Sequence, residues 1–65
     1  MQTYSEKLVM LRGDRSQTSV AAAVGISTSA LAMYECGKRV PRDEIKIALA
    51  KYYNTTVGQL FFNQK

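Results

Sequence analysis

The sequence lacks the residues on which most catalytic and metal sites depend. It has no histidine, no tryptophan, one cysteine and only five acidic residues among 65. A single thiol without histidine cannot form an internal disulfide and provides no set of metal ligands. No acid–base pair or nucleophile–base pair stands out either. We therefore expect neither an enzyme nor a protein that holds a metal or a cofactor, and we expect no small-molecule ligand.

Long apolar runs and targeting signals are missing as well. No stretch approaches the roughly 20 apolar residues that cross a bilayer, and the start of the chain does not have the pattern of a signal peptide. The unpaired Cys36 fits a reducing compartment, so we expect a cytoplasmic protein that does not contact membranes. No linker, repeat or low-complexity segment divides the chain, which indicates one domain over residues 1–65.

Positive charge, by contrast, is plentiful. Nine Lys and Arg residues stand against five Asp and Glu residues, which gives a net charge of +4. Lys38, Arg39 and Arg42 fall within five residues around Pro41. This excess favours a polyanionic partner, although many small basic domains bind no nucleic acid.

Capping residues and glycine stops divide the chain into five expected helices. Their ranges are 4–12, 17–24, 28–36, about 42–53 and a short segment after Thr56 through Phe61. The expected caps are Thr3 with Glu6, Ser16, Ser27, and Thr56 with Gln59, and the stops are Gly13, Gly25 and Gly37. Tyr4, Leu8 and Leu11 form a buried stripe in the first helix. Residues 63–65 are expected to fray.

The fourth segment leaves room for a strand, because apolar and polar residues alternate over 45–49. Its length, its alanine content and the lack of a partner strand favour a helix. Its expected inward face consists of Ile45, Ile47, Leu49, Ala50 and Tyr53. The chain is therefore expected to be an all-α, compact five-helix bundle.

Two of these helices, 17–24 and 28–36, are joined by the tight turn Gly-Ile-Ser. Ala21 faces inward, where a larger side chain would separate the helices, and Gly25 supplies the positive φ of the turn. A helical wheel of the second helix puts Ala30, Leu31 and Tyr34 inward and Thr28, Ser29, Ala32, Met33 and Cys36 outward. This uncharged, shallow outward face suits a helix that enters the major groove, so residues 17–36 predict a helix-turn-helix. An ordinary αα-hairpin is the alternative.

The stretch SQTSVAAAVGISTSALAMYECGKRVP, followed by LAKYYNTTVGQLFF, resembles the Cro and phage-repressor type of helix-turn-helix, the Xre family. The resemblance covers residues 8–62. It implies a lambda-repressor-like domain that binds double-stranded DNA, and a minimal Cro-like regulator that represses transcription from a palindromic operator. The alternative is an antitoxin-like subunit or protein-interaction module with the same fold.

The resemblance also assigns roles to individual positions. It implies base contacts by Gln17, Thr28, Ser29, Ala32 and Met33, and phosphate contacts by Gln17, Ser27, Lys38, Arg39 and Arg42. It implies that Glu35 pairs with Arg12, and that Ala21, Gly25, Leu31 and Tyr34 are structural. The segment 11–17 is about two residues shorter than the usual connection of the family, and Cys36, Tyr52 and Tyr53 depart from its pattern.

Apolar side chains crowd the end of the chain, more than so small a domain is expected to bury. They are Tyr52, Tyr53, Val57, Leu60, Phe61 and Phe62. Because dimers in the family meet through their C-terminal helices, the resemblance implies a homodimer through Asn54, Val57, Phe61 and Phe62. The alternative is a monomer in which both phenylalanines fold back onto the first helix.

Overall fold

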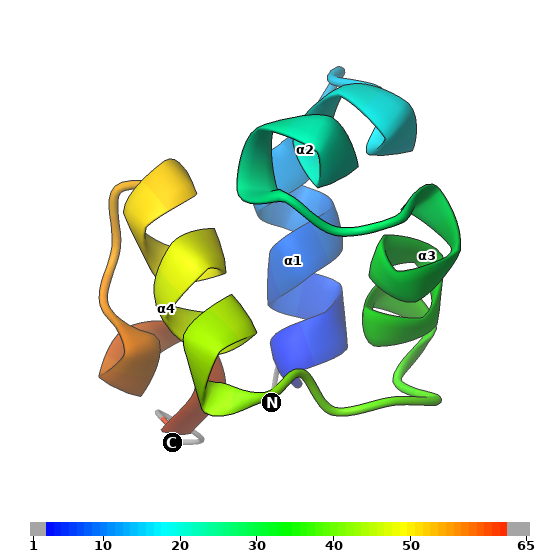
Figure 1. The fold of residues 1–65 in the computed structure, drawn as a ribbon. Helices are drawn as coiled ribbons and strands as arrows, with labels where there is room; N and C mark the ends of the chain where they lie inside the picture. The colour runs from blue at the N-terminus through cyan, green and yellow to red at the C-terminus, as the bar shows by residue number, and fades with distance from the viewer. Residues whose placement is uncertain (1–2, 63–65) are drawn as a thin grey trace.

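The computed structural model describes residues 3–62, and helices make up its architecture (Figure 1). They are α1 (Tyr4–Arg12), α2 (Gln17–Val24), α3 (Thr28–Cys36), α4 (Asp43–Tyr52) and the short π-helix η1 (Gly58–Phe62). No strand occurs within residues 3–62, so the expected all-α fold of five helices is confirmed. The expected bounds of the first three helices are also correct, whereas Arg42 and Tyr53 are the caps of α4 rather than part of it.

Short-range hydrogen bonds at the helix starts explain these bounds. Thr3 Oγ1 accepts from the N–H of Glu6, and the Glu6 carboxylate accepts from the N–H of Thr3, which completes a capping box. The second expected capping box, of Thr56 with Gln59, forms only one of its two hydrogen bonds. Thr56 Oγ1 accepts from the N–H of Gln59 at 3.0 Å, but the Gln59 side chain accepts from the Thr55 hydroxyl instead of the Thr56 backbone.

The core is assembled around α1, which runs between α3 and α4 with α2 across one end (Figure 1). Each helix contributes one large apolar side chain that is fully buried. These are Leu8, Val20, Leu31, Leu49 and Leu60, and burying each of them stabilises the fold by about 1.5–3 kcal/mol. Leu31 anchors α3 in this way, so the opposite face of α3 is held at the surface.

Two side chains that were expected to face inward lie at the surface. Ile47 is 49% exposed and Leu11 is 36% exposed. Successive positions on a helix turn by about 100°, so Ile47 and Leu49 are roughly 200° apart and cannot face the same core. The alternating pattern over 45–49 was therefore a poor guide to the inward face, which comprises the buried Leu49, Ala50 and Tyr53 with Ile45 half-buried.

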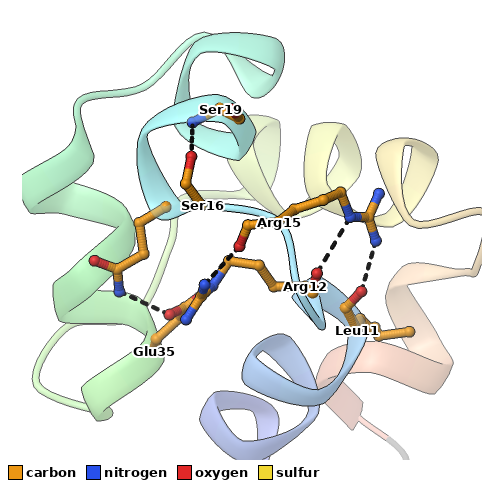
Figure 2. Close-up of polar contacts among 7 residues, drawn as sticks. Leu11, Arg12, Arg15, Ser16, Ser19 and Glu35 are labelled. Atoms are coloured by element: carbon orange, nitrogen blue, oxygen red, sulfur yellow. Dashed lines mark hydrogen bonds and ion pairs between the residues drawn. The ribbon is translucent and has the colours of Figure 1, made fainter.

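Arg15 holds the short connection between α1 and α2. Its guanidinium group donates to the carbonyl of Leu11 at 2.6 Å and to that of Arg12 at 3.2 Å (Figure 2), and these carbonyls lie at the end of a helix, where intrahelical partners run out. Its Cζ lies 5.2 Å and 5.3 Å from the ring centroids of Tyr52 and Tyr53. The short connection and the paired tyrosines both depart from the family pattern, and Arg15 contacts both of them.

The hydroxyl group of Tyr53 is buried beside this arrangement. It has no hydrogen-bond partner among residues 3–62. Burial raises the pKa of Tyr53 above its usual value of 10.0, and the nearby Glu35 charge raises it further, while Arg15 and Arg12 act in the opposite direction. Tyr53 therefore stays neutral at physiological pH.

Within residues 3–62, no single helix is long and apolar enough to cross a membrane. Helices α2 and α3 together would meet the length and composition required, but the chain bends by 107° between them. The segment 63–65, for which fraying was expected, lies outside the described residues.

Candidate nucleic-acid interface

The segment from α2 to α3 has the geometry of a helix-turn-helix. The bend of 107° between the helices lies within the range of about 90–120° that defines the motif. Gly25 has φ 90° and ψ 30°, a left-handed conformation that favours glycine. The N–H groups of Gly25 and Ile26 donate to the carbonyl of Ala21 at 2.8 Å and 2.9 Å, and the Ala21 side chain is fully buried. The turn is therefore fixed by short-range hydrogen bonds.

Ser27 starts the second helix of the motif. Its Oγ accepts from the N–H of Ala30 at 3.0 Å, which is the usual role of a serine N-cap. A hydroxyl group that accepts one hydrogen bond can still donate its own proton. Ser27 can therefore cap α3 and contact a phosphate at the same time.

The outward face of α3 is small and uncharged. Thr28, Ser29 and Cys36 are exposed and Met33 is 43% exposed, whereas Ala32 is half-buried and lies at the edge of this face. The one acid of the helix, Glu35, has a side chain that is only 4% exposed. A helix of this shape and charge can approach a base-pair edge closely without repelling the phosphates.

Glu35 connects α3 with both preceding helices. Its Oε2 accepts from Arg12 Nε at 2.9 Å (Figure 2), and its Oε1 accepts from Gln17 Nε2 at 2.8 Å. The ion pair implied by the resemblance therefore forms, although the connection before α2 is short. The contact with Gln17 was not predicted. It commits one N–H of the Gln17 amide and leaves the second N–H and the carbonyl oxygen for another partner.

Three basic side chains, Lys38, Arg39 and Arg42, surround the loop between α3 and α4, and all three are exposed. Arg39 and Arg42 line a groove of about 250 Å³ together with Tyr34, Val40, Glu44 and Ile45. Arg42 is also the N-cap of α4, but its side chain makes no capping hydrogen bond. The start of α4 thus has two arginines beside it and two acidic residues, Asp43 and Glu44, in its first turn.

One contact of this loop was not foreseen from the sequence. The hydroxyl group of Tyr4 donates to the carbonyl of Arg39 at 2.9 Å, across 35 positions of the chain. Tyr4 was predicted only as part of the buried stripe of the first helix. No local pattern indicates a contact over this separation, so only the fold could reveal it.

The C-terminal surface differs from the expected dimer interface. Phe61 is 7% exposed and packs in the core, so its predicted place in an interface is wrong, while Phe62 is 64% exposed. Neighbouring positions of a helix face different ways, which explains the difference. Asn54 is exposed with φ 59°, and Val57 is half-buried. An apolar groove of about 400 Å³ is lined by Phe62 and Val57 with Asp43, Lys46 and Ile47.

Comparison with known proteins agrees with this geometry. The helix-turn-helix family model matches residues 7–60. No protein among the curated sequences matches the chain. The crystal structure of the P22 c2 repressor protein in complex with synthetic operator 9T is similar, with a TM-score of 0.92 and 23% identity over 98% of this chain and 100% of that chain. At 23% identity, the similarity shows that the two chains share a fold. The chain belongs to the helix-turn-helix family, of the Xre type, whose members are DNA-binding regulators.

Proposed function

We propose that this chain is a small transcriptional repressor that reads a palindromic operator as a homodimer, with α3 in the major groove. The observation that carries the proposal is the uncharged, exposed face of α3 directly before a loop with three exposed basic side chains. Bases are read by short polar and apolar groups in the groove, and phosphates are bound by cations at its rim. The proposed site of action is the cytoplasm, where the free thiol of Cys36 persists.

Base reading is assigned to the N-terminal half of α3 and to Gln17. The hydroxyl groups of Thr28 and Ser29 can donate to or accept from several base edges, and Ala32 and Met33 suit the methyl group of thymine. The Gln17 amide, held by Glu35, presents its remaining N–H and its carbonyl oxygen. The free N–H can donate either to a base or to a phosphate.

Phosphate binding is assigned to the helix starts and to the loop. Ser27 donates from the start of α3, and Arg39 and Arg42 line the groove at the start of α4. Lys38 adds a third charge at the other end of the loop. Because these groups flank α3, they would fix its position over the bases without selecting a sequence.

Ser29→Ala is expected to change the preferred base at one or two base pairs, by about 1–3 kcal/mol, because it removes one base contact. The fold should remain intact, since Ser29 is exposed. Titration of a panel of single-base operator variants measures the preference. The control is Ser19→Ala, another exposed serine, which should leave the base preference unchanged. A Ser29→Ala profile identical to that of the unmodified protein removes Ser29 from the set of base readers.

The homodimer is assigned to the apolar surface formed by Phe62, Val57 and Ile47, together with the exposed Asn54. Phe62 and Ile47 are the exposed members of this surface, 64% and 49% exposed. To fit a palindromic operator, the proposed dimer has to place the two α3 helices about 34 Å apart, one turn of the duplex. Such a contact is weak in solution and is completed on the operator.

Phe62→Ala is expected to weaken operator binding about tenfold or more and to favour one bound copy over two, because it truncates the most exposed apolar side chain of this surface. Sedimentation with and without a palindromic duplex measures the stoichiometry. The control is Met10→Ala, because Met10 is similarly exposed, at 66%, but lies on α1. One copy per duplex at saturation for the unmodified protein, or unchanged two-copy binding for Phe62→Ala, would rule out this interface.

A further inference from the structure

The loop that carries the basic side chains has few hydrogen bonds of its own. At one end, the N–H groups of Gly37 and Lys38 donate to carbonyls of α3, and at the other end the carbonyl of Arg42 accepts from an amide of α4. Between these ends, no backbone–backbone hydrogen bond within residues 3–62 reaches positions 39–41. Only Pro41 is buried there, and its neighbours are exposed. The loop therefore depends on other parts of the fold for its shape.

Tyr4 supplies that support from the first turn of α1. Its hydroxyl group donates to the carbonyl of Arg39 at 2.9 Å. The tyrosine ring is half-buried, and its centroid lies 5.7 Å from that of the buried Phe61. The next residue, Ser5, lies close to Gly37 at the start of the same loop. A Cβ added to Gly37 would lie 3.5 Å from Ser5 Oγ. The ring of Tyr4 thus packs against the core, and its hydroxyl group forms a hydrogen bond with the loop.

We infer that Tyr4 is a positioning residue for phosphate binding, which holds the backbone of Arg39 so that this residue keeps its place in the groove that it lines with Arg42 before DNA arrives. This inference rests on the proposed function. A loop that is already ordered loses less conformational freedom when it binds. Tyr4 therefore raises the affinity through preorganisation of Arg39, without any contact of its own with the DNA.

The test is Tyr4→Phe, which removes the hydroxyl group and keeps the ring against Phe61. Affinity for operator and for random duplex DNA should both fall about threefold to tenfold, because one hydrogen bond that orders a phosphate-binding loop is lost. The thermal midpoint should stay near that of the unmodified protein. The matched control is Tyr52→Phe. That tyrosine is also half-buried, but its ring contacts Arg15 and Tyr53 and not this loop, so its affinity should be unchanged.

A double-mutant cycle separates positioning from general destabilisation. In an Arg39→Ala background, Tyr4→Phe should cost no further affinity, because the side chain that it positions is gone. Nuclear magnetic resonance order parameters of Arg39 and Val40, measured without DNA, should fall in Tyr4→Phe. Unchanged order parameters, or an equal loss of affinity with and without Arg39, would overturn the inference. If the unmodified protein binds no duplex, the proposed function fails, whereas the order parameters still test the contact itself.

Discussion

Arg12→Ala is expected to lower the free energy of unfolding by about 3–5 kcal/mol, because it leaves a buried carboxylate without its opposite charge. The Glu35 side chain is 4% exposed, and Arg12 Nε lies 2.9 Å from its Oε2. After the substitution, Glu35 would keep only the amide of Gln17 as a partner. A domain of this size has a total stability of only several kcal/mol. Urea unfolding followed by circular dichroism should therefore show a partly unfolded protein even without denaturant.

Two variants serve as controls for this result. Arg42→Ala truncates an exposed arginine and should change the free energy of unfolding by less than about 0.5 kcal/mol. The double substitution Arg12→Met with Glu35→Met removes both charges and should cost less than Arg12→Ala alone, because no unpaired buried charge remains. If Arg12→Ala were as stable as Arg42→Ala, the ion pair would not hold α1 against α3.

Operator affinity is expected to fall about a thousandfold when salt rises from about 50 mM to about 200 mM. Each copy presents Lys38, Arg39 and Arg42 on the loop after α3, so a dimer makes about six phosphate contacts, and the logarithm of the affinity should change with the logarithm of salt with a slope near −5. Fluorescence anisotropy of a labelled duplex measures this slope. Binding that does not change over this range of salt would contradict the proposed interface.

Arg39→Ala identifies where the salt dependence arises. It should weaken binding to operator and random duplex alike and flatten the slope by about one unit for each bound copy, because phosphate contacts carry no sequence information. The control is Lys51→Ala, since Lys51 is exposed in the last turn of α4, away from the loop, and it should leave the slope unchanged. An unchanged slope in Arg39→Ala would show that Arg39 makes no phosphate contact.

Local signals were sufficient to predict most of the helices, because their causes lie within a few residues. Ser16 and Ser27 cap the helices that follow them, and Gly25 and Gly37 end them in left-handed conformations. The face of a helix was harder to predict where the pattern was ambiguous. The alternation at Ile47 suggested burial, but the helical period places this side chain at the surface.

Contacts between distant residues could not be predicted in this way. Tyr4 reaches Arg39 across 35 positions, and Gln17 reaches Glu35 across 18. Each contact depends on how α1, α2 and α3 pack together, which is a property of the whole fold. The resemblance to a family compensated in part, since it implied the ion pair of Glu35 that the structure contains.

The outward face of α3 shows both the strength and the limit of sequence reasoning. A helical wheel correctly put Thr28, Ser29 and Met33 at the surface, whereas Ala32 is half-buried. Which base each of these side chains reads depends on how α3 is docked in the groove, and the pattern of exposure along the helix does not encode that geometry. Their roles as base contacts stay predictions until the operator is known.

Selection of bound sequences from a pool of random duplex DNA tests the central claim most directly. The claim is that α3, flanked by the basic loop, reads a specific operator in the major groove. Sequencing after several rounds should return one enriched palindrome whose half-sites are centred about one helical turn apart, roughly 10 base pairs. A recovered pool with the same base composition at every position as the starting pool would contradict the claim.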